Sequence, residues 1–203
     1  MKLNPRTLIK TLLFIAALPI STWANAHTGV DGAHSASFMT GLLHPLFGLD
    51  HLTAMVAVGV WSALAARQAG PAMLWGPLGF ANMLLAGALI GLQGLSLPAV
   101  EPVIAASLLV MGLLVLVKLR LPGPVAALLV GTFAMFHGVV HGQELASSAS
   151  AFQALAGMLC ATVVLHGAGL ALGWWLRGVN LWIGRLVGSV VALMGGLLLA
   201  HLA

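Results

Sequence analysis

Charged side chains are scarce in this sequence: its 203 residues include 8 lysines and arginines and 4 aspartates and glutamates. Hydrophobic residues make up 61% of the chain, and the mean hydropathy is +1.08. An ordinary water-soluble domain has about 25% charged residues. The composition therefore excludes that class and indicates an integral membrane protein embedded in a lipid bilayer.

Cysteine is also rare, and several catalytic motifs are missing. The single cysteine, Cys160, can form neither an intrachain disulfide nor a multi-thiolate metal site. The sequence contains no P-loop, no G-x-S-x-G elbow and no H-E-x-x-H motif. We therefore expect a protein that is not an enzyme and that does not use ATP.

Three of the 8 basic residues, Lys2, Arg6 and Lys10, lie within the first ten positions. A short apolar run and then Ala24-Asn25-Ala26 follow them. This order predicts a secretory signal peptide over residues 1–26, and the alternative is an uncleaved seventh helix. Without these three residues the charges nearly balance, so no nucleic-acid partner is expected.

Residues 27–39 are expected to form an extracytoplasmic tail that contains His27 and His34. If cleavage follows Ala26, His27 becomes the first residue and offers both its α-amine and its ring to a cation. The alternative is a polar tail that binds no metal.

Six apolar runs follow, and each is long enough to cross a bilayer as a helix of roughly 20 residues. They cover 40–66, 71–93, 98–118, 123–144, 150–176 and 179–202. We expect an all-α polytopic membrane protein in which residues 40–203 form a bundle of six transmembrane helices.

The remaining basic residues predict the orientation. If residue 27 lies outside, five basic side chains fall on the cytoplasmic side, as the positive-inside rule requires; they are Arg67, Lys118, Arg120, Arg177 and Arg185. Both ends of the mature chain then lie in the periplasm, and the protein lies in a bacterial inner membrane.

The first predicted span contains the octapeptide His44-Pro45-Leu46-Phe47-Gly48-Leu49-Asp50-His51. Imidazoles and carboxylates are costly beside lipid, so they indicate function by default. On one continuous helix His44 and His51 share a face, and Pro45 suits the first helical position. Asp50 is then either a metal ligand or an acceptor that orients an imidazole. The alternative makes Asp50 and His51 interfacial residues bonded to the backbone.

The fourth span repeats this chemistry with His137, His141 and Glu144 at positions i, i+4 and i+7, so the three share one helical face. Two imidazoles one turn apart can chelate one ion, and the carboxylate can neutralise its charge. Gly138 and Gly142 leave room for a neighbouring helix, for which we expect the helix with His51. The alternative is that the histidines only form hydrogen bonds between helices.

Two further residues have open roles. His166 lies about 16 residues into the fifth span. It is either the next binding position inward or a packing residue bonded to a neighbouring polar group. Glu101 starts the third span, where it either lines a charged vestibule or complements the helix dipole.

The donor set of nitrogens and oxygens without thiolates suits nickel, cobalt, zinc or copper, and the residues alone do not choose among them. The scattered methionines show no paired motif that would favour copper. The main alternative is a membrane haem b protein with bis-histidine ligation, for example by His51 and His141. A metal-dependent hydrolase is a third possibility, which the missing catalytic motifs disfavour.

The motifs resemble those of the HupE/UreJ family of nickel/cobalt permeases. They are HPLFGLDH at 44–51, LPAVE at 97–101, FHGVVHGQE at 136–144 and LHGAG at 165–169. The resemblance covers essentially the whole mature chain. It implies secondary uptake of nickel, or in some members cobalt, for hydrogenase or urease maturation, with the ion as substrate and no permanently bound cofactor.

By the same resemblance, seven residues are expected to carry transport: His44, Asp50, His51, Glu101, His137, His141 and Glu144. Val140 stands where the family is expected to have a smaller residue, usually alanine. That departure removes no ligand.

Overall fold

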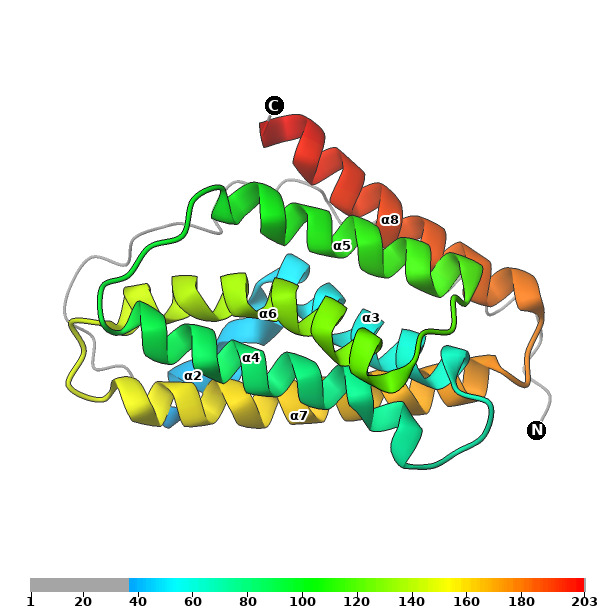
Figure 1. Cartoon of the computed structure of the whole chain (residues 1–203), viewed down its shortest axis with the longest axis horizontal. Coiled ribbons are helices and arrows are strands. Elements are labelled where there is room, and N and C mark those ends of the chain that lie inside the picture. Colours follow the sequence, from blue (N-terminus) through cyan, green and yellow to red (C-terminus); the bar gives the residue numbers. More distant parts are fainter. Residues whose placement is uncertain (1–36, 203) are drawn as a thin grey trace. The chain divides into compact units, whose positions relative to one another are not determined.

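A computed structural model describes residues 37–202, which lie in one compact unit. All regular structure within this range is helical (Figure 1). In chain order the elements are α2 (Phe38–Phe47), α3 (Leu49–Ala65), the 3₁₀ helix η2 (Pro71–Leu74), α4 (Trp75–Gly91), α5 (Val100–Val117), α6 (Gly123–Leu145), α7 (Ala151–Leu176) and α8 (Leu181–Leu202). The predicted signal peptide, His27 and His34 lie outside the described residues.

Five of these helices are long and apolar enough to cross a membrane, and α2 and α3 form a sixth span if the bent pair is counted as one. The protein is therefore a multi-pass membrane protein. The last five predicted spans agree with the observed helices to within a few residues. The first is not the continuous helix that was predicted, because α2 and α3 meet at an angle of 84°.

The break in the first span lies at Gly48. The hydroxyl of Ser37 caps the start of α2, so Pro45 lies inside this helix and not at its first position, as we had predicted. The N–H of Gly48 donates to the His44 carbonyl at 3.4 Å, and the Gly48 carbonyl accepts from the N–H of Leu52 at 2.8 Å. Gly48 therefore ends one helix and caps the next.

The helices pack closely in pairs, α4 with α6, α5 with α8 and α3 with α7, while α2 lies on α7. A Cβ at Gly138 would collide with the Leu84 carbonyl, and one at Gly142 with the Ala88 carbonyl. Both acceptors belong to α4, so α4 occupies the place that we expected for the helix with His51. Close approach at paired small residues is typical of membrane helices.

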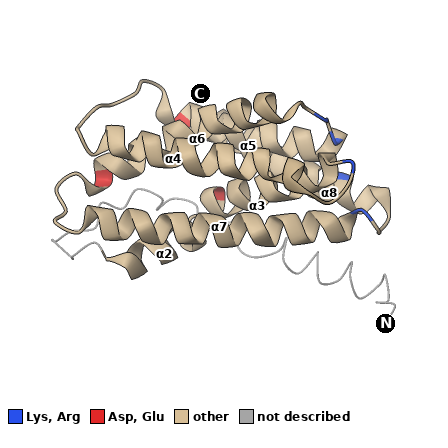
Figure 2. Ribbon diagram, turned by 60° about the horizontal axis from the view of Figure 1, so that its bottom comes forward, with Lys and Arg blue, Asp and Glu red and all other residues tan. Residues whose placement is uncertain are grey.

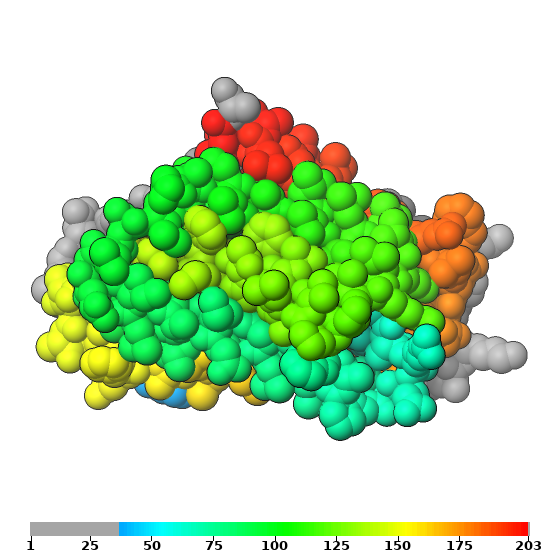
Figure 3. Space-filling view, in the orientation of Figure 1, coloured from blue at the N-terminus to red at the C-terminus, as the bar shows by residue number. Residues whose placement is uncertain are grey.

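Helices α4, α5 and α6 together cover one face of the molecule (Figure 3). Large apolar side chains of these three helices are exposed, such as Leu89 at 40%, Leu113 at 44% and Leu128 at 72%. Apolar side chains of this size are suited to contact with lipid tails, which are as apolar as leucine.

Lysine and arginine gather at one end of the bundle, and we call this the basic end (Figure 2). Here α3, α5 and α7 finish, and α4, α6 and α8 begin. The guanidinium of Arg177 donates to the carbonyls of Ala63, Ala66 and Arg67, and the indole of Trp61 donates to the Leu119 carbonyl at 2.9 Å. Side chains thus join the helix ends directly.

Candidate metal centre

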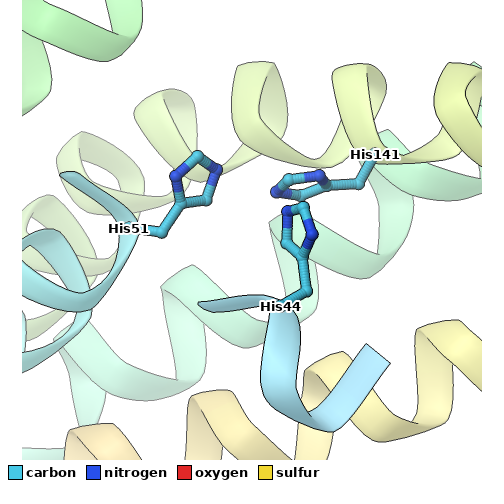
Figure 4. Close-up of side chains that lie close together, drawn as sticks. All are labelled: His44, His51 and His141. Atoms are coloured by element: carbon cyan, nitrogen blue, oxygen red, sulfur yellow. The ribbon is translucent and has the colours of Figure 1, made fainter. Parts of the chain in front are cut away.

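Three histidines from three helices meet away from the basic end: His44 of α2, His51 of α3 and His141 of α6. One ring nitrogen of each lies within 4.8 Å of those of the other two. The ring of His141 lies 4.7 Å from that of His44 and 4.8 Å from that of His51, between centroids. Figure 4 shows the three rings turned toward one another. We call this group the three-histidine centre.

The break at Gly48 allows this approach. On a straight helix, residues seven positions apart are separated by about 10.5 Å along the axis, at 1.5 Å per residue. In the structure the ring centroids of His44 and His51 are 5.8 Å apart. The two histidines lie together because the helix is broken between them, so the prediction that they share one face of a continuous helix is wrong.

A carboxylate accompanies two of the three imidazoles. Oδ1 of Asp50 lies 2.9 Å from Nδ1 of His51, and Oε2 of Glu144 lies 3.1 Å from Nδ1 of His141. An ionised carboxylate can only accept a hydrogen bond, so each Nδ1 carries a proton, and in the neutral imidazole each Nε2 keeps its lone pair. Acidic partners fix metal-binding histidines in the same way elsewhere. The geometry favours an orienting role for Asp50 and Glu144 over direct ligation.

His137 lies one turn from His141 on α6 and is 1% exposed. Its ring centroid is 5.1 Å from that of His51. The Ser107 hydroxyl donates to the Ile104 carbonyl at 2.6 Å, so toward Nε2 of His137, 3.3 Å away, it can only accept. Nε2 therefore carries the proton, and the buried Nδ1 has no hydrogen-bond partner among the described residues. His137 is thus a fourth imidazole beside the centre, with one ring nitrogen that no described residue engages.

The sequence did not indicate a role for Ser107, because a single serine in an apolar span carries no spacing signal. Glu101 and His166 were also predicted as site residues. Glu101 is exposed in the first turn of α5, and His166 is buried on α7, with its ring 5.1 Å from that of Phe80.

The centre combines imidazole nitrogens with two nearby carboxylates. Neutral imidazoles suit borderline divalent ions such as nickel, cobalt, copper and zinc, and the carboxylates offset part of the positive charge. His141 is 3% exposed and His51 is half-buried, whereas His44 is exposed. The centre is thus open on the side of α2 and closed on the side of α6.

Comparison with known proteins gives consistent matches. The sequence matches the family described as HupE / UreJ protein over residues 15–198. It is 41% identical over 186 residues to Protein HupE of Rhizobium leguminosarum bv. viciae, and the alignment covers 91% of this chain and 94% of that protein. No solved structure matches this chain. The family match includes every residue of the three-histidine centre.

Proposed function

This chain belongs to the HupE/UreJ family, and from that premise we propose that it carries a divalent transition-metal cation across the membrane, nickel first and cobalt second. The ion is the substrate and not a resident cofactor. The resemblance further supports a role in supplying hydrogenase or urease maturation. Uptake is secondary, driven by the membrane potential or by the ion's own gradient.

The observation that carries this proposal is the convergence of His44, His51 and His141 from three helices. Histidines that served only to join helices would use their ring nitrogens on one another or on the backbone. Here the Nδ1 atoms of His51 and His141 face carboxylates, and this leaves both Nε2 lone pairs for a third partner. A divalent cation fits that requirement.

The charge distribution supports inward movement. The positive-inside rule assigns the basic end to the cytoplasm, and the three-histidine centre then faces the periplasm of a bacterial inner membrane. A divalent cation that crosses an inside-negative potential gains about 4.6 kcal/mol per 100 mV, twice the single-charge value. We count the bent pair α2 and α3 as the first of six spans.

The haem alternative fits the centre less well. The rings of His51 and His141, the pair named for this alternative, have centroids only 4.8 Å apart, and the His44 ring lies 4.7 Å from that of His141. A macrocycle inserted between these rings would have to push α2, α3 and α6 apart. A small ion needs no such separation.

Uptake of radioactive nickel into vesicles tests the proposal. The purified full-length protein is reconstituted into pure-lipid vesicles, and an inside-negative potential is applied. We expect nickel entry that rises with the potential and disappears in His141→Ala. His201→Ala is the matched control, because His201 is exposed in the last turn of α8. Vesicles with wild-type protein that admit no nickel would refute autonomous transport.

A further inference from the structure

Phe80 of α4 lies between two buried histidines of different helices. Its ring centroid is 6.1 Å from that of His137 on α6 and 5.1 Å from that of His166 on α7. Phe80 is 2% exposed, and His166 is 3% exposed. The three rings form a continuous buried row that begins beside the three-histidine centre.

This row leads toward the basic end. His141 lies 18 residues after the start of α6 at Gly123 and His137 lies 14 residues after it, which is about 27 Å and 21 Å from the basic end at 1.5 Å per residue. His166 lies 10 residues before the end of α7 at Leu176, or about 15 Å from it. His166 therefore lies inward of His137, and we call His166 together with the Phe80 ring beside it the next layer.

A cavity at the basic end approaches the same layer from the other side. It has a volume of about 670 Å³, and its lining includes Ser62, Gly76, Arg67 and Arg120. Gly76 lies one helical turn from Phe80 on α4, and a Cβ on it would lie 2.7 Å from Oγ of Ser62. That buried Oγ has no hydrogen-bond partner among the described residues.

Nε2 of His166 is likewise buried without a hydrogen-bond partner in the described part of the chain. An imidazole that served only packing would be expected to have its buried polar atoms paired. Thr162, one turn away on α7, shows the ordinary case: it is completely buried, and its hydroxyl donates to the Met158 carbonyl at 2.8 Å. The orphaned nitrogen of His166 thus points to a ligand.

We propose that His166 is an inner binding position for the transported cation, and that the Phe80 ring closes the path between this position and the outer histidines. This inference rests on the proposed function. The ion would pass from the three-histidine centre beside His137 and Phe80 to His166, and from there past Ser62 into the cavity. An apolar ring in such a path excludes water and a hydrated ion until it moves aside. Several moderate binding positions also suit conduction better than one tight one.

The first test compares His166→Gln with Thr162→Val, a control of equal burial on the same helix. Nickel binding is measured on purified protein in detergent, and initial uptake is measured in vesicles. We expect His166→Gln to keep nickel affinity at the outer centre within about twofold and to lose at least about tenfold in uptake rate. Thr162→Val should keep both.

The outcomes separate the two proposals. Wild-type uptake by His166→Gln overturns the inner position and leaves the proposed function standing. No nickel entry through the wild-type protein overturns both. Retained nickel binding shows that the variant is folded, so a lower uptake rate then reports on the inner path.

A second variant keeps the inference testable if His166→Gln does not fold. Phe80→Leu shortens the barrier but stays apolar, and Phe152→Leu is the control, because Phe152 is 71% exposed on α7. We expect Phe80→Leu to raise the uptake of magnesium, which the outer imidazoles disfavour, at least threefold relative to nickel. An unchanged ratio of magnesium to nickel uptake would overturn the role of Phe80.

Discussion

Two stretches of this chain carry the same side-chain chemistry on different backbones. Residues 44–51 are divided between α2 and α3, whereas residues 136–144 lie within the single helix α6. Each stretch supplies two histidines and one acid. The broken stretch, residues 44–51, brings its two histidines closer together than a continuous helix allows. The continuous stretch, residues 136–144, keeps its two histidines at helical spacing on α6, which packs against α4. We call the half of the centre on residues 44–51 the adjustable half and the half on residues 136–144 the fixed half.

The largest expected effect comes from disrupting the fixed half. Gly142→Leu would drive a side chain into the Ala88 carbonyl and separate α6 from α4. Backbone cannot yield as a side chain does, so the cost should exceed the about 1–3 kcal/mol typical of overpacking. We expect loss of folded protein, measured as the monodisperse fraction in size-exclusion chromatography.

Gly167→Leu is the control for this change, since nothing lies within 4 Å of a Cβ at Gly167. Normal recovery of Gly142→Leu would show that the packing of α4 on α6 does not hold the fixed half in place.

Removing one histidine from each half should separate their contributions. His141 is buried and paired with Glu144, whereas His44 is exposed. We expect His141→Ala to weaken nickel binding by more than the about 10–100-fold that follows loss of an orienting partner, and His44→Ala to weaken it less. Equilibrium binding of radioactive nickel measures both. A larger loss in His44→Ala would reverse the assignment of the fixed half.

The two acids give a finer comparison. Asp50→Asn and Glu144→Gln keep shape but remove the charge that holds Nδ1 protonated, and each should weaken nickel binding by about 10–100-fold. Asp50 should matter more, because its side chain is 24% exposed and that of Glu144 is 43% exposed, so solvent screens the second pair more strongly. Calorimetric titration with nickel measures the difference, and equal losses would contradict this ranking.

The smallest expected effect concerns the break itself. In Gly48→Ala the added Cβ would lie 3.1 Å from Oδ1 of Asp50 and 3.3 Å from Nδ1 of His51. This pair would have to shift by a few tenths of an ångström, so we expect nickel affinity to fall by about two- to fivefold, below the range for losing an orienting partner. Gly196→Ala, with open space around it, is the control. Unchanged affinity would show that the adjustable half absorbs the methyl group.

Much of this architecture is predictable from sequence, because membrane helices are recognised by the length and hydropathy of their apolar runs. The helices from α4 to α8 agree with the predicted spans, and histidines placed at span entrances indicated the centre before any geometry was known. Glycines four apart predicted close helix contacts, and Gly138 and Gly142 make them. These features are local, so a single sequence carries them.

The remaining features depend on partners that helical periodicity does not identify. The break at Gly48 was not predicted, because a continuous apolar run predicts one helix and we expected Pro45 at a first helical position, whereas it lies near the end of α2. The neighbour of Gly138 proved to be α4, since a small residue indicates contact but not with which helix. Phe80 looks like any other apolar residue of a span, and only the fold shows that it lies between His137 and His166.

Arg177 has a consequence beyond its place in the charge pattern. A helix finishes with carbonyls that lack a donor within it and with a partial negative charge. Arg177 itself follows the last turn of α7. Its guanidinium donates to the carbonyls of Ala63, Ala66 and Arg67 at the end of α3, and its positive charge lies beside the partial negative charge there. A side chain that follows α7 thus caps the C-terminus of a different helix, α3. A lysine there would preserve the charge but not the planar fork that reaches three acceptors at once.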